Sequence, residues 1–162
     1  MARLSRVLRR LAPRRLAPRS RSTVAAAVPV RRREGGDLEF LLVRTRNGER
    51  WTFPKGGVER GESMSEAAAR EAREEAGVTG AVGAEPLGVY RYAPSRNGFD
   101  DVTAFLLDVK RDGLHAEVGR EPTWLGVEAT LSRLVQGRDS GYGEAMQRIL
   151  RAAQRAARGR GA

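Results

Sequence analysis

The sequence predicts one domain of the α/β (α+β) class over residues 22–157 of a 162-residue chain. Three observations predict it: short apolar segments separated by turn residues, a strongly bracketed helix at 64–76, and two further helical segments before the C-terminal end. Strands interleaved with a few helices are typical of this class. The length suffices for a real core, since a domain of about 150 residues buries roughly 70% of its unfolded surface.

The first half of the domain reads as strands and turns. A polar turn with two glycines and the Asn47-Gly48 pair, a tight-turn signal, separate the apolar segments. The segments themselves are partly β-branched and end at turn residues, which favours strands over Thr23–Val30, Leu38–Arg44 and Trp51–Phe53. Pro29 predicts an edge position or a bulge in the first strand, because proline donates no hydrogen bond to a ladder.

The second half predicts two longer strands and two helices. The strands span Gly80–Tyr92 and Val102–Val109, and a polar loop over 94–101 is expected to join them. A short strand ends at Trp124-Leu125. Helices are expected over Leu131–Gln136 and from Gly143 to about Ala157, where Met146, Ile149 and Leu150 have helical spacing. Residues 158–162 are expected to form a basic tail.

The helix at 64–76 has both ends marked in the sequence. Ser63 and Glu66 have the spacing of a capping box, in which each side chain accepts a hydrogen bond from the other residue's backbone. Nearly all residues from Met64 to Ala76 are good helix formers. Gly77 follows where a left-handed C-cap is favoured. We therefore expect the helix to begin after Ser63 and to end before Gly77.

Three carboxylates lie close together on this helix. Glu71 and Glu75 are four residues apart and share a face, and Glu74 borders that face. Their mutual repulsion would be relieved by a divalent cation, and such hard oxygen ligands suit Mg²⁺ or Mn²⁺. The preceding loop, Lys55-Gly56-Gly57, could add a backbone carbonyl, and Arg70 could hold a carboxylate by paired hydrogen bonds. The alternative is a solvated helix face with i, i+4 ion pairs.

The segment from Gly56 to Val78 resembles the Nudix box, G-x5-E-x7-R-E-U-x-E-E-x-G-U, where U is a bulky aliphatic residue. Gly56, Glu62, Arg70-Glu71, Glu74-Glu75 and Gly77 occupy every fixed polar and glycine position. Ala72 is smaller than the usual aliphatic residue, which we expect to weaken packing under the helix. The flanking WTFPKGG and GVYRY segments resemble the diphosphoinositol polyphosphate and diadenosine polyphosphate phosphohydrolases and their bacterial relatives. This resemblance covers residues 22–157 and implies the Nudix fold, a mixed sheet between helices.

The resemblance also implies a reaction and roles for residues. Nudix enzymes cleave phosphoanhydride bonds with the help of a divalent metal, here Mg²⁺ or Mn²⁺. The resemblance implies that Glu71 and Glu75 bind the metal together with the backbone carbonyl of Lys55 or Gly56. We expect Glu74 to be the general base, although Glu75 is the alternative, and Glu62 to serve the outer shell of the metal. Gly56, Arg70 and Gly77 would have structural roles in the motif.

An anionic substrate needs cations, and the resemblance places residues 44–46 against its phosphates. Arg44 and Arg46 are therefore expected to bind substrate, and Arg21 and Arg138 could contribute. The alternative for each is an ordinary solvated arginine. The expected substrates are diadenosine or diphosphoinositol polyphosphates; the alternatives are nucleoside triphosphates, nucleotide sugars or RNA 5′ ends. A third hypothesis is a non-catalytic nucleotide-binding domain, against which the complete set of box carboxylates argues.

The charge is concentrated at the two ends. Of the net charge of +10, residues 1–33 contribute +11 and residues 148–162 contribute +5, which leaves 34–147 at −6. Residues 1–21 form an arginine-rich arm, expected to be disordered. This arm could instead contact a polyanion or a membrane surface, or be a transit peptide. The chain has no cysteine, which fits a reducing compartment, so a cytoplasmic location is expected. No apolar run reaches the about 20 residues of a membrane span.

Overall fold

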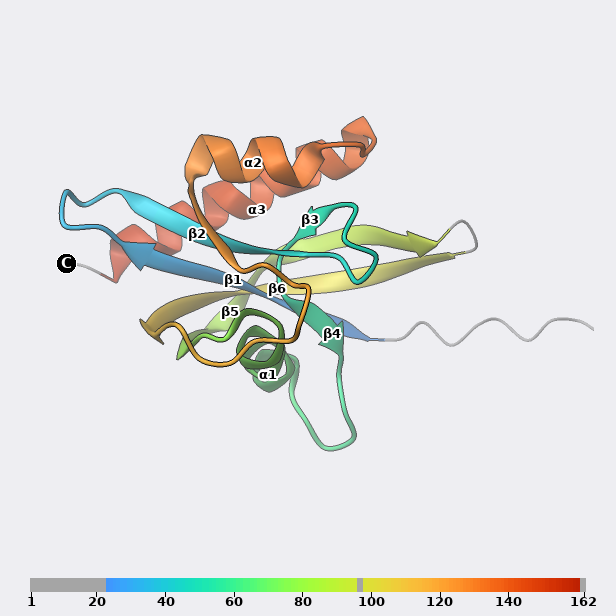
Figure 1. Ribbon diagram of the computed structural model, residues 1–162, viewed down its shortest axis with the longest axis horizontal. Helices are drawn as coiled ribbons and strands as arrows, with labels where there is room; N and C mark the ends of the chain where they lie inside the picture. The colour runs from blue at the N-terminus through green and yellow to red at the C-terminus, as the bar shows by residue number, and fades with distance from the viewer. Residues whose placement is uncertain (1–22, 96–97, 161–162) are drawn as a thin grey trace, which may run out of the picture.

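The computed structural model describes residues 23–95 and 98–160, and these form one sheet covered by helices on both faces (Figure 1). The elements are β1 (Val24–Arg32), β2 (Leu38–Arg44), β3 (Trp51–Thr52), β4 (Lys55–Gly57), α1 (Met64–Ala76), β5 (Thr79–Ser95), β6 (Gly98–Arg111), β7 (Thr123–Gly126), α2 (Val127–Val135) and α3 (Ser140–Gly159). The order of the strands in the sheet is β3-β2-β1-β6-β5, with β4 paired to β1 and β7 paired to β2. Only the β1–β6 pair is parallel among the described strands, so the sheet is mixed.

Alternation along the strands divides the core into two clusters. On β1, Ala25 and Ala27 belong to the cluster under α1, whereas Ala26 and Val28 belong to the cluster under α2 and α3. This follows from the period of two in a strand, which sends successive side chains to opposite faces. In Figure 1, α1 accordingly covers one face of the sheet, and α2 and α3 cover the other.

Small residues line the interface between α1 and the sheet. The helix buries alanines that share a cluster with Ala25 and Ala27 of β1, namely Ala67, Ala68, Ala72 and Ala76. Ala72 is fully buried in this alanine-rich layer. The small side chains allow the helix backbone to approach the sheet closely, which fixes the height of the α1 carboxylates above the strands.

Pro29 lies in a central strand, so the expected edge position is wrong. The same side of β1 pairs with β4 through Val24–Ala26 and with β2 through Val30–Arg32. Pro29 falls between these two ladders, where neither register gives it a partner. The missing N–H is therefore tolerated at the gap between β4 and β2, within a strand that is buried from Val24 to Val30.

Four local predictions differ from the structure. The expected loop over 94–101 is mostly strand, because β5 continues to Ser95 and β6 begins at Gly98. Lys55–Gly57, expected as a loop, is strand β4 against β1. Helix α2 begins at Val127 instead of residue 131. Helix α3 ends at Gly159, two residues past the predicted domain boundary.

The arginine-rich arm lies outside the described residues, among which no helix is long and apolar enough to cross a membrane.

The capping box of α1 gives a stability prediction. The Ser63 hydroxyl accepts from the Glu66 N–H at 3.2 Å, and the Glu66 carboxylate accepts from the Ser63 N–H at 2.7 Å. Ser63→Ala should lower the free energy of unfolding by about 1 kcal/mol, because it leaves an N-terminal N–H without its partner. Urea denaturation measures this, with Ser132→Ala on the exposed face of α2 as the control. An equal loss in both variants would contradict the capping role.

Candidate active site

The loop between β6 and β7 is fastened to the C-terminal end of α1. Gly77 adopts a left-handed conformation (φ 66°, ψ 31°), and its N–H donates to Arg73 O. The Gly77 carbonyl then accepts from Leu114 N–H at 2.9 Å, and the Glu74 carbonyl accepts from Glu117 N–H at 2.8 Å. These two bonds satisfy carbonyls that the helix end leaves open. They hold the loop beside the helix that carries the carboxylates.

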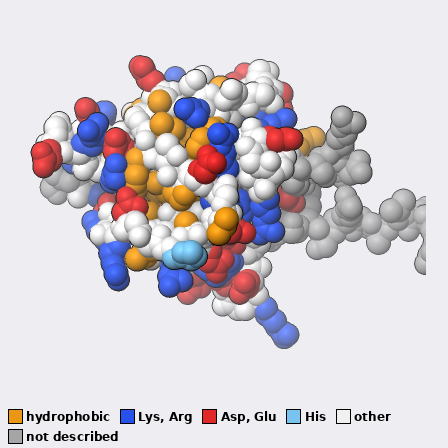
Figure 2. Space-filling model, viewed as in Figure 1, with side chains coloured by type: hydrophobic (Ala, Val, Ile, Leu, Met, Phe, Trp, Pro, Cys, Tyr) orange, Lys and Arg blue, Asp and Glu red, His pale blue; other side chains and the backbone are white. Residues whose placement is uncertain are grey.

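A cavity of about 880 Å³ opens where this helix meets β4, β5 and the turn after β2, and we call it the first cavity. Charges of both signs line it: the acidic residues are Glu49, Glu71, Glu75 and Asp100, and the basic residues are Arg46, Arg50, Lys55 and Arg120. Figure 2 shows the same mixture of acidic and basic side chains over the visible face. The carboxylates of such a cavity can bind a metal ion, and its arginine and lysine side chains can bind an anionic ligand.

Glu75 is the most buried carboxylate of the cavity, with 5% of the residue exposed. Its Oε2 accepts from the Lys55 N–H at 3.0 Å, and its Oε1 accepts from Arg120 Nη2 at 2.6 Å. Burial raises the pKa of the Glu75 carboxyl, and the Arg120 charge and the Lys55 N–H oppose that rise. Arg120, itself 5% exposed, also pairs with Glu117 at 2.6 Å and donates to Arg44 O. Glu75 is thus held from two sides.

Arg70 organises the other side of α1. Its Nε and Nη2 donate to the two oxygens of Glu62 at 2.9 and 3.1 Å, and Nη1 donates to Glu71 at 2.7 Å. Nη2 also donates to Gly57 O at 2.9 Å. The bond from Arg70 lowers the pKa of Glu62, and the bond to Glu62 raises the pKa of Arg70. This network ties the loop before α1 to the helix. A solvated helix face with only i, i+4 ion pairs, the alternative considered from the sequence, would not make these contacts to the loop.

Gly56 is required by the position of Glu71. A Cβ at residue 56 would overlap the Glu71 carboxylate. The backbone of β4 and the Glu71 carboxylate are therefore in direct contact, and a side chain at residue 56 would have to displace that carboxylate. This contact places the backbone of β4 beside a carboxylate that lines the cavity.

The donor set fits a hydrated divalent cation. Within 23–95 and 98–160, no three His, Cys, Asp or Glu side chains come together closely enough to hold a metal ion by themselves. Glu71 and Glu75 nevertheless line the same cavity together with Gly56. Mg²⁺ commonly uses only one or two carboxylates and keeps several waters or substrate phosphate oxygens. Two carboxylates and a neighbouring backbone oxygen are the hard ligands that this mode requires.

Glu74 lies apart from the residues that line the cavity. Its side chain is 54% exposed, and Arg70 Nη1 lies 3.3 Å from its Oε2. Glu62, predicted for the outer shell, is turned toward Arg70. The structure thus brings Glu71 and Glu75 to the cavity and leaves Glu74 at the outer side of the helix.

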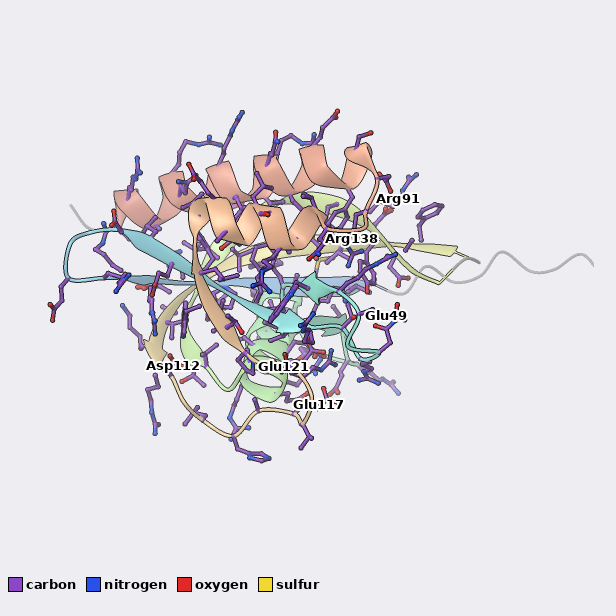
Figure 3. The ribbon with its side chains drawn as sticks, turned by 45° about the horizontal axis from the view of Figure 1, so that its top comes forward. Glu49, Arg91, Asp112, Glu117, Glu121 and Arg138 are labelled. Atoms are coloured by element: carbon purple, nitrogen blue, oxygen red, sulfur yellow. The ribbon has the colours of Figure 1, made fainter. Side chains whose placement is uncertain are left out.

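The predicted substrate arginines divide between several places. Arg46 lines the first cavity. Arg44 does not: its Nε pairs with Glu121 at 3.2 Å, and its guanidinium lies 4.2 Å from the Trp51 ring centroid. Arg138 lies at the junction of α2 and α3 (Figure 3) and lines a neighbouring cavity. Arg21 lies outside the described residues.

Several residues of the first cavity were not predicted as site residues from the sequence, among them Arg120, Arg50 and Tyr92. Arg120 lies in the loop before β7, which has no periodicity or motif to mark it. Arg50 precedes β3 and resembles any surface arginine. Tyr92 was assigned only to a strand, yet the Lys55 ammonium lies 3.9 Å from its ring centroid. The partners of Arg120 and Tyr92 are distant in the sequence, so local patterns carry no signal for them.

The comparisons with known proteins agree with this architecture. The model of the NUDIX domain matches residues 21–140, which is well over half of the chain. The chain belongs to the Nudix family.

The curated relatives match smaller parts of the chain, whereas a solved structure matches more of it. "Nudix hydrolase 13, mitochondrial" of Arabidopsis thaliana is 35% identical over 105 residues, covering 58% of this chain and 52% of the relative. The asymmetrical bis(5′-nucleosyl)-tetraphosphatase of Sus scrofa is 55% identical over 42 residues, covering 25% of this chain and 29% of the relative. The C. elegans Ap4A hydrolase structure has a TM-score of 0.63 and 25% identity, covering 81% of this chain and 94% of that one. The chain thus spans about half or less of the curated relatives it matches.

The buried pair gives a prediction about stability. Arg120→Leu should lower the free energy of unfolding by about 3–5 kcal/mol, because it leaves the Glu75 carboxylate buried without its partner. The double variant Arg120→Leu/Glu75→Gln should recover a large part of that loss, since no unpaired charge remains. Thermal and urea unfolding of the three proteins measure both effects. A double variant as unstable as the single one would mean that lost packing, not the uncompensated charge, is the cause.

Proposed function

We propose that this protein hydrolyses a phosphoanhydride bond in a small molecule, with diadenosine or diphosphoinositol polyphosphates as the substrate class. The observation that carries the proposal is the pairing of two fixed carboxylates, Glu71 and Glu75, with cations in one cavity. The similarity to the pig asymmetrical tetraphosphatase and to the C. elegans Ap4A hydrolase supports the same reaction class.

Mg²⁺ or Mn²⁺ is the proposed metal, held by Glu71, Glu75 and the backbone carbonyl of Lys55 or Gly56. When bound, it would shield phosphate oxygens and lower the pKa of an attacking water. The chain's own contribution is to hold these ligands still: Arg120 and the Lys55 N–H fix Glu75, and Arg70 fixes Glu71. Phosphoryl transfer depends mainly on such positioning and on charge stabilisation.

Cations in the first cavity would hold the polyphosphate. Arg46 and Arg50 come from the turn between β2 and β3, and Lys55 comes from β4, so they line the cavity from neighbouring segments. The Lys55 ammonium lies 3.9 Å from the Tyr92 ring centroid, a cation–π contact that helps to orient the lysine side chain. Three cations in the same cavity as the carboxylates could bind phosphates on either side of the scissile bond.

Glu74 remains the proposed general base. Glu71 and Glu75 are each held by a short contact to an arginine, whereas Glu74 has a single 3.3 Å contact and is more than half exposed. It is therefore the box carboxylate with most freedom to turn toward a bound water. Glu74→Gln should lower kcat by about 100-fold or more with little change in KM, because a general base typically contributes that much.

The assay is a hydrolysis screen with Mg²⁺ and with Mn²⁺. The panel contains diadenosine polyphosphates, a diphosphoinositol polyphosphate, nucleoside triphosphates, ADP-ribose and triphosphorylated RNA. Glu128→Gln, on exposed α2, is the matched control and should keep full activity. Turnover of one class, lost in Glu74→Gln, supports the proposal. If Glu74→Gln stays within threefold of the parent while Glu71→Gln is inactive, the base is not Glu74. If no compound turns over, the proposed function is wrong.

A further inference from the structure

Helix α3 carries a line of arginines on its outer face. Met146, Ile149 and Leu150 of this helix are buried in the core cluster that it shares with the sheet, and the opposite face of the helix is exposed. The exposed face holds four arginines at spacings of three and four residues, which we call the α3 stripe: Arg148, Arg151, Arg155 and Arg158. Side chains with these spacings are neighbours on a helix, so the stripe runs for about 15 Å along one side of α3.

The charge of the α3 stripe is not neutralised within the chain. Glu144 lies at its start, and Asp37 shares a small cavity with Arg158 at its end. The positions three and four residues from Arg151 and Arg155 hold only Gln, Ala, Gly and Arg. No arginine of the stripe forms an ion pair with another residue in the part of the chain that the structure describes. Like charges at these spacings destabilise a helix, and an anionic partner would remove that cost.

The helix dipole accounts for only one end of this arrangement. It favours cations at the C-terminal end of a helix, but the effect falls off within the last turn, where Arg158 lies. Arg148 and Arg151 lie in the middle of α3. On α1, by contrast, the arginines stand among glutamates of the same helix. The predominantly cationic face of α3 therefore indicates a binding surface.

The basic surface continues beyond the end of α3. Arg32, at the end of β1, donates from Nη2 to the Ala157 carbonyl at 3.3 Å, which brings its guanidinium to the C-terminal end of the helix. A cavity of about 230 Å³ lies there, and its charged residues include Arg32, Lys110 and Arg160. Its acidic residue, Asp108, is paired with Lys110 at 2.6 Å. The cationic surface thus extends from α3 onto the end of the sheet, and one small anion would cover only part of it.

The chemistry of this face matches a polymer of phosphates. Arginine binds phosphate oxygens through paired N–H donors, and neighbours on the stripe have Cβ atoms about 5–6 Å apart, so each can contact a different phosphate. No large apolar side chain is exposed on α3. Such side chains are what the centre of a protein interface and a helix inserted into a membrane surface both use. A polyanion with regularly spaced charges is therefore the best match.

We propose that the α3 stripe binds the phosphate backbone of a nucleic acid. The contacts would not depend on the base sequence, because contacts to phosphates position a protein without reading bases. Helices α3 and α1 cover opposite faces of the sheet, so this surface is separate from the carboxylates of α1 (Figure 1). The proposal goes beyond the hydrolysis of a small molecule and does not depend on it.

The test measures affinity and its dependence on salt. Fluorescence anisotropy with a labelled single-stranded RNA and a labelled double-stranded DNA compares the parent chain with Arg151→Gln/Arg155→Gln at about 50 to 200 mM salt. Loss of two phosphate contacts should reduce the slope of log K against log salt concentration by about 1.5–2. Affinity at the lowest salt should fall about tenfold or more, since charged hydrogen bonds are lost. A loss with only one of the two polymers would identify that polymer as the ligand.

The matched control is Arg60→Gln/Arg73→Gln, which removes the same charge from exposed positions in and just before α1. Its slope should equal that of the parent. Arg151→Lys/Arg155→Lys should also keep the slope, because both charges remain. Arg and Gln are both good helix formers, so the stripe variant should unfold at the temperature of the parent. The arginines of residues 1–21 are present in every variant, so their contribution is common to all of them.

Three results would overturn the proposal. The first is an unchanged slope in the stripe variant. The second is an equal loss in the stripe variant and the control, which would mean diffuse attraction to the whole molecule. The third is a stripe variant that loses co-sedimentation with phosphatidylserine vesicles but keeps nucleic-acid binding, which would identify a membrane surface.

Hydrolysis assays separate this surface from the proposed function. The stripe variant should keep the kcat and KM of the parent for any compound that the screen identifies. A parent protein that hydrolyses no compound, but loses nucleic-acid binding when the stripe is changed, would refute the proposed function and support the surface.

Discussion

The ion pair between Glu75 and Arg120 links parts of the chain that are far apart in the sequence. Glu75 belongs to α1, Arg120 belongs to the loop before β7, and Arg120 also donates to the carbonyl at the end of β2. The second oxygen of Glu75 accepts from the backbone of β4. Burying two charges is costly unless their hydrogen bonds are satisfied, and here both partners have additional bonds. This contact joins α1 to β4, to the end of β2 and to the loop before β7, and so links the segments that form the buried side of the cavity.

Arg70 plays the corresponding role at the surface end of the motif. It binds Glu62, Glu71 and the carbonyl of Gly57, so one side chain joins the loop, the helix and the glycine strand. The two arginines thus immobilise different carboxylates of the same helix from opposite sides. A site that must gather like charges around a cation needs such fixed countercharges while the cation is away, because repulsion would otherwise splay the carboxylates apart.

The sequence predicted those features whose causes lie within a few residues. The bounds of α1 follow from Ser63, Glu66 and Gly77, and the structure confirms them because caps are local contacts. Strand β4 was missed because Lys-Gly-Gly has no strand pattern and is defined only by its partner β1. The loop expected over 94–101 was wrong because pairing between β5 and β6 extends polar segments that alone favour a turn. Arg120 could not be identified because its partner lies 45 positions away.

The place of β1 in the sheet has a consequence for how the chain folds. This strand comes first among the described elements, yet it pairs with β6 along most of its length, and Val24 aligns with Val102, 78 positions later. Closing so long a loop costs entropy before any contact compensates for it, so a sheet centred on this pair should form slowly. During synthesis the apolar first strand must wait, without its parallel neighbour, until most of the domain has left the ribosome. Over that interval its unpaired backbone groups are exposed to association with other chains.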